Sequence, residues 1–339
     1  MMPLMPHSDT VYLVVSLDVE EEGLFSGNYA TRNPSVTNIV HLTRMTPLLK
    51  KGIRPTLFCA YSVLDDKPSR AVLKTLQDRV EIGAHLHHWN TPPLDAAPRD
   101  KKAGHTQYVS AADVPLELFA AKIQRLFQIC TDTQGAPPTS FRMGRWDMHR
   151  KHWPALAQAG VLCDASIRPL HATSNGPNHF NAPATPYWVP VNAARIFETP
   201  LTVTPLIHNL PRLLTLLPRR IAKIAQTGLY AWGALTLLPV YHSLQLMQAV
   251  TRIFLSRGGN VLSLTWHSSE MMPNGAPHLP SEASVARLMD KISTYIDWLR
   301  AHVALQCLSM DELRQKLGDS APTPRPVAGD TPQNDWTYA

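Results

Sequence analysis

Three histidines stand within four residues of one another at the end of an apolar run, in the segment Glu-Ile-Gly-Ala-His-Leu-His-His-Trp at positions 81–89. Imidazole is a common metal ligand, and such a density of it is typical of a divalent-metal site. A lone histidine is more often structural. The interpretation as a metal site therefore depends on the other reactive groups that the fold brings to these rings.

Further reactive side chains follow apolar runs elsewhere in the chain. Asp18 and Glu20 come after such a run near the N-terminus, Arg142 lies in Phe-Arg-Met-Gly-Arg-Trp, and His267 lies in Leu-Thr-Trp-His-Ser-Ser-Glu. Hydrolysis of an amide requires a base for the water, polarisation of the carbonyl and an acid for the departing amine. We predict that Asp18 is the general base, that His267 is the general acid, and that Arg142 keeps Asp18 ionised.

Short β-branched runs alternate with helical segments, which is the pattern of a parallel α/β sheet or barrel. Six strands are predicted, at 11–17, 56–60, 80–84, 139–142, 162–166 and 261–266. The reactive residues follow or end these strands. Because the loops at the carboxyl ends of parallel strands converge, we expect these side chains to meet at one end of the sheet.

Capping residues predict the helices between and after these strands. One helix runs from an N-cap at Ser35 to residue 51, before Gly52, and a second runs from Asp113 and Pro115 to about residue 133. Others are predicted at 150–159, at 281–303, and in the C-terminal segment 306–318, where Ser309 and Glu312 form a capping box. The tail 319–339 lacks apolar periodicity and is predicted to be disordered.

Residues 205–250 break the pattern with a basic and apolar sequence. The interval 199–269 holds no Asp or Glu but six Arg or Lys residues. Its apolar stretch 229–241 is 13 residues long and includes Gly233 and Pro239, whereas about 20 residues are needed to cross a bilayer. We interpret 205–250 as an insertion that either rests on a membrane or the mouth of the site, or packs as an extra helical hairpin. Nucleic acid is not an expected partner, because no recognition motif accompanies the charge.

Bulk properties point to a reducing compartment. The chain has 339 residues and four widely spaced cysteines without a C-x-x-C pair, unlike a disulfide-stabilised secreted domain. The N-terminal segment lacks the basic and apolar regions of a secretory signal. The expected location is therefore cytoplasmic, with peripheral membrane contact through 205–250.

The motifs taken together resemble those of the polysaccharide deacetylases of carbohydrate esterase family 4. The segments that carry the resemblance, in the family's order, are 16–20 (Ser-Leu-Asp-Val-Glu), 81–85, 141–146, 163–166 (Cys-Asp-Ala-Ser) and 266–270 (Trp-His-Ser-Ser-Glu). The likeness covers about residues 10–305. It implies a distorted (β/α)7-type barrel, here with the helical insertion before the last strand, and a metal held by one Asp and two His. The segments around His85 and His267 most resemble the branch found in lipopolysaccharide and exopolysaccharide biosynthesis.

Two departures from the family pattern concern the metal. The family spaces the two histidines of its second motif four apart, but position 89 is Trp, so the second ligand is His87 or His88. Residues i and i+2 of an extended segment face the same way, which favours His85 with His87. The acid expected beside the base is replaced by Val19, so either Glu20 reaches the metal instead or Asp18 binds it directly.

The resemblance implies a metal-dependent hydrolase, most simply a Zn²⁺ enzyme, that removes acetyl groups from an amino sugar. The expected substrate is a cell-surface polysaccharide or its lipid-linked precursor. Asp164 joins the catalytic group as a residue that orders a loop or supports Arg142 and His267. Trp89 and Trp146 are predicted to stack on a sugar, with packing inside the barrel as the alternative. Glu270 is predicted to make either a helix-side contact or a substrate contact.

Two other functions remain open at this level. The first is a metal-independent hydrolase of cyclic amides with the same barrel, which the substitution at Val19 favours. The second is a catalytically degenerate member that binds glycan.

Overall fold

The computed structural model describes residues 10–94, 109–172 and 176–324. Within them, the strands are β1 (Val11–Val19), β2 (Thr56–Ala60), β3 (Glu81–Leu86), β4 (Ser140–Met143), β5 (Cys163–Asp164), β6 (Tyr187–Val191), β7 (Ala194–Glu198), β8 (Val203–Pro205), β9 (Ala234–Thr236), β10 (Val261–His267) and β11 (Leu305–Leu308). Nine of these form one sheet in the order β10-β1-β2-β3-β4-β5-β7-β6, with β11 also pairing with β1. β8 and β9 form a separate antiparallel pair.

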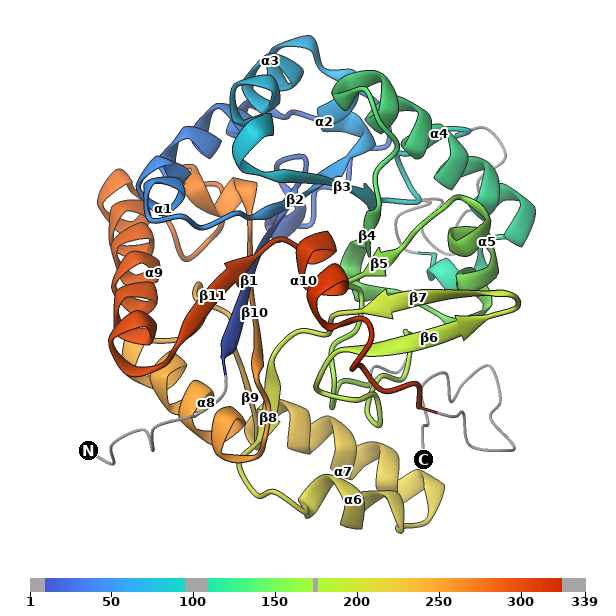
Figure 1. The fold of residues 1–339 in the computed structure, drawn as a ribbon. Helices are drawn as coiled ribbons and strands as arrows, with labels where there is room; N and C mark the ends of the chain where they lie inside the picture. Colours follow the sequence, from blue (N-terminus) through green and yellow to red (C-terminus); the bar gives the residue numbers. More distant parts are fainter. Residues whose placement is uncertain (1–9, 95–108, 173–175, 325–339) are drawn as a thin grey trace.

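The main sheet is parallel except for the β6–β7 hairpin, and it curls into a barrel-like shape with the helices around it (Figure 1). β1 pairs with β10, β2 and β11, and every residue of this strand is buried. Such a strand is covered on both faces, which explains its near-continuous apolar sequence. The fold is the (β/α)-barrel-like one that was predicted.

The helices surround the sheet. They are α1 (Thr46–Lys50), α2 (Tyr61–Asp65), α3 (Lys67–Leu76), α4 (Leu116–Gln134), α5 (Trp153–Gln158), α6 (Leu210–Thr215), α7 (Arg219–Trp232), α8 (Leu244–Ser256), α9 (Glu282–His302) and α10 (Met310–Leu317). Among the described residues, no helix combines the length and apolar character needed to span a bilayer.

Two apolar layers hold the barrel. The larger lies between the sheet and the outer helices and includes Leu17 and Val19 of β1. The smaller fills the barrel interior, where Val14 and Phe58 pack with Met310 of α10. Ser309 begins α10 with the predicted capping box. α10 thus packs into the end of the barrel opposite the carboxyl ends of the parallel strands.

The six predicted strands are present, but the sequence did not indicate β6, β7, the β8–β9 pair or β11. β6 contains Pro190, which a strand tolerates only where its missing N–H is not needed. β11 occupies Leu305–Leu308 and bonds to β1. The prediction of a C-terminal helix over 306–318 is therefore wrong at its start.

Two other local predictions need correction. The segment 35–51 begins as a 3₁₀ helix (Thr37–Met45) and becomes α-helical only at Thr46. Ser35 does not cap it; its hydroxyl donates to Glu22 instead. The predicted disordered tail 319–339 is ordered at its start, because the backbone N–H of Trp188 donates to the carbonyl of Pro322 (2.8 Å); residues 325–339 lie outside the described ranges.

Candidate active site

The strand register brings the predicted residues together at one end of the barrel. Asp18 pairs with His267 across β1 and β10, and His85 pairs with Arg142 across β3 and β4. Alternation along β1 directs Asp18 toward these groups and Val19 into the outer apolar layer. The position where the family pattern has an acid therefore faces away from the site.

Three side chains that could hold a metal ion lie close together: those of Glu20, His85 and His87. One ligand atom from each lies within 4.8 Å of the others, and all three residues are buried. Glu20 Oε2 is 3.2 Å from Nε2 of His85 and 3.2 Å from Nε2 of His87. Two imidazoles and one carboxylate are a donor set suited to Zn²⁺ and similar ions. The residues therefore fit the metal that the resemblance implies.

The outer nitrogen of each ring is fixed by a hydrogen bond. His85 Nδ1 donates to the carbonyl of Arg142 (3.1 Å), and His87 Nδ1 donates to Glu21 Oε1 (2.9 Å). In the neutral rings these bonds keep the proton on Nδ1, and they turn Nε2 toward Glu20. The hydrogen-bond partners of metal-binding histidines commonly have this effect. Burial lowers the pKa of His87, but Glu21 and Glu20 outweigh it and raise that pKa to about 10. An ion bound here must therefore compete with a proton.

Glu21 was not predicted as a site residue. Its carboxylate accepts from Asn90 Nδ2 (2.6 Å) and from Ser62 Oγ (3.0 Å) as well as from His87. Burial raises the pKa of Glu21, but His87 outweighs this effect and lowers it overall. The sequence shows a run of three acids at positions 20–22, but only the contact with His87 distinguishes Glu21 from Glu22.

His88 and Trp89 lie outside the group. His88 Nε2 donates to the carbonyl of Val109 (2.9 Å), and burial lowers the pKa of His88 to about 4. Trp89 is 1% exposed, and its ring stacks on that of His87 at 4.2 Å between centroids. The prediction that Trp89 stacks on a sugar is wrong, because its ring is buried against the histidine; the packing alternative holds.

Gly144 makes room for His87. A Cβ added at this position would lie 2.3 Å from Cδ2 of the His87 ring and 2.7 Å from the carbonyl oxygen of Leu86. The following residues Arg145 and Trp146 both have positive φ, which is uncommon for residues other than glycine. The β4 loop therefore turns tightly against the candidate metal ligands.

Asp18 is held by Arg142 on one side and open to the site on the other. Arg142 Nη1 donates to Asp18 Oδ1 (2.6 Å) and to the hydroxyl of Thr265 (2.9 Å). Its Nη2 donates to Ser16 Oγ, and its Nε donates to the carbonyl of Ala165. Asp18 Oδ2 lies 3.7 Å from His267 Nε2 and 4.0 Å from His85 Nε2. Burial raises the pKa of Asp18, but Arg142, His85 and His267 outweigh it and lower that pKa.

His267 is oriented by Glu270. The Glu270 carboxylate accepts from His267 Nδ1 (2.9 Å) and from its backbone N–H (2.8 Å). Burial lowers the pKa of His267, yet Glu270, Glu20 and Asp18 together raise it to about 10, so the ring carries a proton at neutral pH. Glu270 is itself buried. Glu270 also forms the capping box of the short helix Ser268–Met271, so the geometry agrees with the helix-side contact predicted for it, and the substrate contact stays a prediction.

Asp164 does not reach the reacting groups. Its carboxylate accepts from the hydroxyl (2.6 Å) and the N–H (3.2 Å) of Ser166, whose Oγ accepts from the N–H of Met143 (2.8 Å). Through Ser166, Asp164 thus bonds to β4 beside Arg142, and within the described residues it has no hydrogen bond or ion pair with Asp18 or His267. Of the two roles predicted for Asp164, the ordering of a loop agrees with these bonds to Ser166, and the support of Arg142 and His267 stays a prediction.

Trp146 lies at the edge of the site. Its ring packs against the guanidinium of Arg142 at 5.1 Å and against that of Arg168 at 5.6 Å. The side chain is only partly buried, so one part of it remains available to a ligand.

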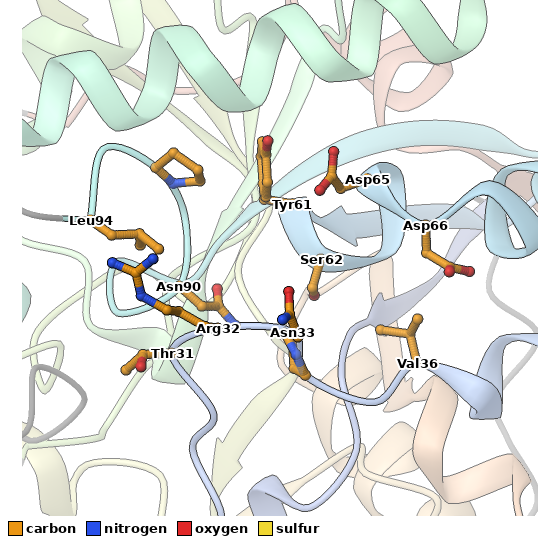
Figure 2. A pocket seen from close by; sticks show the side chains of 12 residues that line it. Thr31, Arg32, Asn33, Val36, Tyr61, Ser62, Asp65, Asp66, Asn90 and Leu94 are labelled. Carbon is orange, nitrogen blue, oxygen red and sulfur yellow. The ribbon is translucent and has the colours of Figure 1, made fainter.

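A cavity of about 480 Å³ adjoins the Glu21 hydrogen bonds (Figure 2). Ser62 and Asn90 belong to its wall, together with Tyr61, Arg32 and Asp65. Asn90 Oδ1 is buried and lacks a hydrogen-bond partner among the described residues. Cavities of roughly 300–1,000 Å³ that carry a few polar groups are the usual form of small-molecule sites.

No protein-family model matches the chain, and no curated protein matches it in sequence. Solved structures do match its fold. A protein named as a polysaccharide deacetylase from Mycobacterium smegmatis aligns with a TM-score of 0.57 and 13% identity over 97% of this chain and 98% of the other. A protein named as a glycoside hydrolase/deacetylase from Parabacteroides distasonis gives 0.57 and 9% over 98% and 79%.

PuuE allantoinase aligns with a TM-score of 0.52 and 12% identity over 91% of this chain and 90% of the other. At such identities the similarity establishes the fold alone. The chain therefore has the (β/α)-barrel-like fold found in proteins named as polysaccharide deacetylases. In this chain, two histidines, a glutamate and an aspartate that is bound by Arg142 lie at the carboxyl end of that barrel.

Proposed function

We propose that the protein is a metal-dependent hydrolase that removes the acetyl group from an amino sugar of a cell-surface polysaccharide or its lipid-linked precursor. The observation that carries the proposal is the convergence of Glu20, His85 and His87 beside the free oxygen of Asp18. One acetyl amide group would thus contact the candidate metal site, the candidate base and the candidate acid. Amide hydrolysis requires these three functions together.

Glu20, His85 and His87 would hold the ion, and their mixed nitrogen and oxygen donors favour Zn²⁺. When bound, such an ion supplies Lewis-acid polarisation of the acetyl carbonyl. Glu21 acts behind His87 by holding its ring in the productive tautomer.

Asp18 would act as the base through Oδ2. Because Arg142 binds the other oxygen, Oδ1, the carboxylate stays ionised and its orientation is fixed. It takes a proton from water as the water oxygen bonds to the acetyl carbon. Asp18 is 4% exposed, which limits the access of other water to it.

His267 would act as the acid. Glu270 keeps its Nδ1 occupied, so the proton on Nε2 is the one directed into the site. This proton passes to the amine nitrogen as the carbon–nitrogen bond breaks, and the products are acetate and a free amino sugar. Each such proton transfer typically contributes about 10² to 10⁴ in rate. Trp146 and the cavity beside Asn90 supply surface for the sugar chain.

The direct test replaces His85 or His87 with Ala and measures bound metal by elemental analysis together with acetate release from acetylated amino sugars. Both variants should lose the metal and the activity. His88→Ala is the matched control, because its ring faces Val109 and it should retain the metal. Unchanged acetate release in the His85 and His87 variants would refute the proposed mechanism.

The second candidate is a metal-independent cyclic-amide hydrolase, which the fold shared with PuuE allantoinase supports. Activity on a cyclic ureide that survives a chelator, in protein without stoichiometric metal, would favour it. A glycan-binding protein without catalysis is the third candidate. Tight binding of glycan without acetate release under any metal would favour that one.

A further inference from the structure

We propose that the exposed face of the α6–α7 hairpin is a docking surface for an anionic lipid bilayer. The hairpin surface is defined here as the exposed side chains of residues 206–232. α6 and α7 lie side by side at the lower edge of the molecule in Figure 1, beyond the β8–β9 pair. The proposal uses none of the candidate catalytic groups, so it goes beyond the proposed function.

Exposed apolar side chains concentrate on this surface. In the described part of the chain, twelve large hydrophobic side chains are exposed, and nine of them lie between Leu206 and Tyr241. Trp232 is 88% exposed, Leu216 78% and Ile224 77%. Scattered exposed apolar residues are ordinary, but a contiguous group marks an interaction site.

The helical period sorts α7 into two faces. Ala222, Gln226 and Leu229 are buried against the protein. Ile221, Ile224 and Trp232 are separated by three and eight residues, which places them on one side of the helix, and all three are exposed. α7 is therefore apolar on its inner and on its outer side. The inner face accounts for its packing, and nothing within the described residues covers the outer one.

Positive charge borders the exposed apolar row. Arg212, Arg220 and Lys223 are exposed, and the interval 199–269 contains no Asp or Glu to neutralise them. Exposed Lys or Arg next to Trp and aliphatic side chains is the composition of helices that lie in the interface of anionic membranes. Trp232 is the kind of side chain that anchors at that depth.

The same charges argue against a second copy of this chain as the occupant. A two-fold dimer through this face would place Arg220 and Lys223 of both copies in one interface. No acidic side chain in 199–269 is present to pair with them. A bilayer that contains anionic lipid would bury the exposed apolar side chains and attract the positive charges to its headgroups.

The hairpin also connects to the candidate active site. The Tyr230 hydroxyl on α7 bonds to Arg168, whose guanidinium packs on Trp146, and Trp146 packs on Arg142. Tyr241, past the end of the hairpin, packs against His278 at 5.3 Å, and His278 Nε2 lies 3.6 Å from Glu270 Oε1. If the proposed function holds, docking would bring the site close to the lipid headgroups, where a lipid-linked sugar is presented.

The experiment measures sedimentation of the full-length protein with vesicles of phosphatidylcholine alone, or with about one third phosphatidylglycerol. We expect binding to the anionic vesicles that weakens as salt rises. The double variant Ile224→Ser/Trp232→Ser should lose at least about tenfold in partitioning, because it removes the two most exposed apolar groups of α7. Val40→Ser/Leu116→Ser, at exposed apolar positions elsewhere, is the matched control and should bind like the parent.

A second pair of variants tests the charge. Arg220→Gln/Lys223→Gln should reduce binding to anionic vesicles, while Lys67→Gln/Lys74→Gln on the exposed side of α3 should not. Equal partitioning of the parent and the hairpin variants would overturn the proposal. So would a concentration-dependent dimer in analytical ultracentrifugation that Trp232→Ser abolishes, if the parent fails to bind vesicles.

Vesicle binding requires neither metal nor acetylated sugar. His85→Ala should therefore bind vesicles as the parent does, even though the proposed function predicts that it loses metal. The docking proposal and the deacetylase proposal thus fail in different measurements.

Discussion

Two pairs of buried carboxyl groups lie on the same sheet and have pKa values shifted in opposite directions. Asp18 and Glu20 are surrounded by Arg142 and histidines, which outweigh burial and lower both pKa values. Asp164 and Glu198 are paired in the register of β5 and β7. Burial raises the pKa of both, and the neighbouring Asp164 raises that of Glu198 further.

Burial alone therefore does not identify a reactive carboxylate in this barrel. Desolvation acts on all four groups in the same direction, and the cations decide the outcome. The first pair is kept ionised, as a base and a metal ligand require. The second pair has raised pKa values and, through Ser166, Asp164 bonds to β4, so Asp164 differs from the other residues first grouped as catalytic.

The largest expected effect separates the two pairs directly. Asp18→Asn should lower kcat/KM by about 10² to 10⁴, because the base is lost while the hydrogen bond to Arg142 remains possible. Asp164→Asn should lower it by less than about tenfold, since only a supporting contact changes. Acetate release and thermal unfolding of both variants would check this. Equal losses of activity would remove the distinction between the pairs.

The next effect concerns the carboxylate behind the metal ligands. Glu21→Gln should weaken metal affinity by about 10- to 100-fold, because it removes a carboxylate that bonds to a metal-binding histidine. The neighbouring Glu22 accepts from Thr37 (2.7 Å) and from the N–H of Asn38 (2.8 Å), away from the histidines. Glu22→Gln is therefore the control, and its metal affinity by competition titration should match that of the parent.

The pH profile tests the acid. The proton of His267 is present below its raised pKa and lost above it. Activity should therefore fall on the alkaline side. Glu270→Gln removes the carboxylate that contributes most to raising this pKa, so the alkaline limb should move to lower pH by about one unit. An unshifted limb in kcat against pH would show that His267 is not the group that titrates.

The smallest expected effect is on stability. A carboxyl whose pKa is raised on folding contributes most stability below its unfolded pKa and loses that contribution as pH rises. The parent should therefore lose stability through Glu198 as pH rises above the unfolded pKa of a glutamate, about 4.3. Glu198→Gln should flatten this dependence, as measured by urea unfolding at several pH values. A parallel slope in the two proteins would contradict the raised pKa.

Much of the barrel was predictable because its central strands are buried on both faces and end in polar residues. The run before Asp18 and the run before His85 each gave a strand and a candidate site residue. β6 and β7 were missed because they form a short hairpin with mixed polarity and a proline, stabilised by tertiary contacts that include the bond from Trp188 Nε1 to the carbonyl of Gly318 (2.7 Å).

Only some residues of the candidate site were predicted from the sequence. Side chains that the strand register sets, such as Asp18, His85 and His267, followed from strand ends. Side chains whose roles depend on a neighbour across the barrel did not. Glu21 is recognisable only once His87 is placed, and the burial of Trp89 only once its ring is seen against that histidine.

The direct pairing of Asp18 with His267 across β1 and β10 has a consequence for how this scaffold diversifies. The two side chains proposed as base and acid are spaced by a backbone ladder and not by the surrounding loops. Loop exchange is therefore expected to alter which saccharide enters while leaving the proton-handling pair in register. An engineer seeking new substrates would vary the segments around the mouth and leave these two strands untouched.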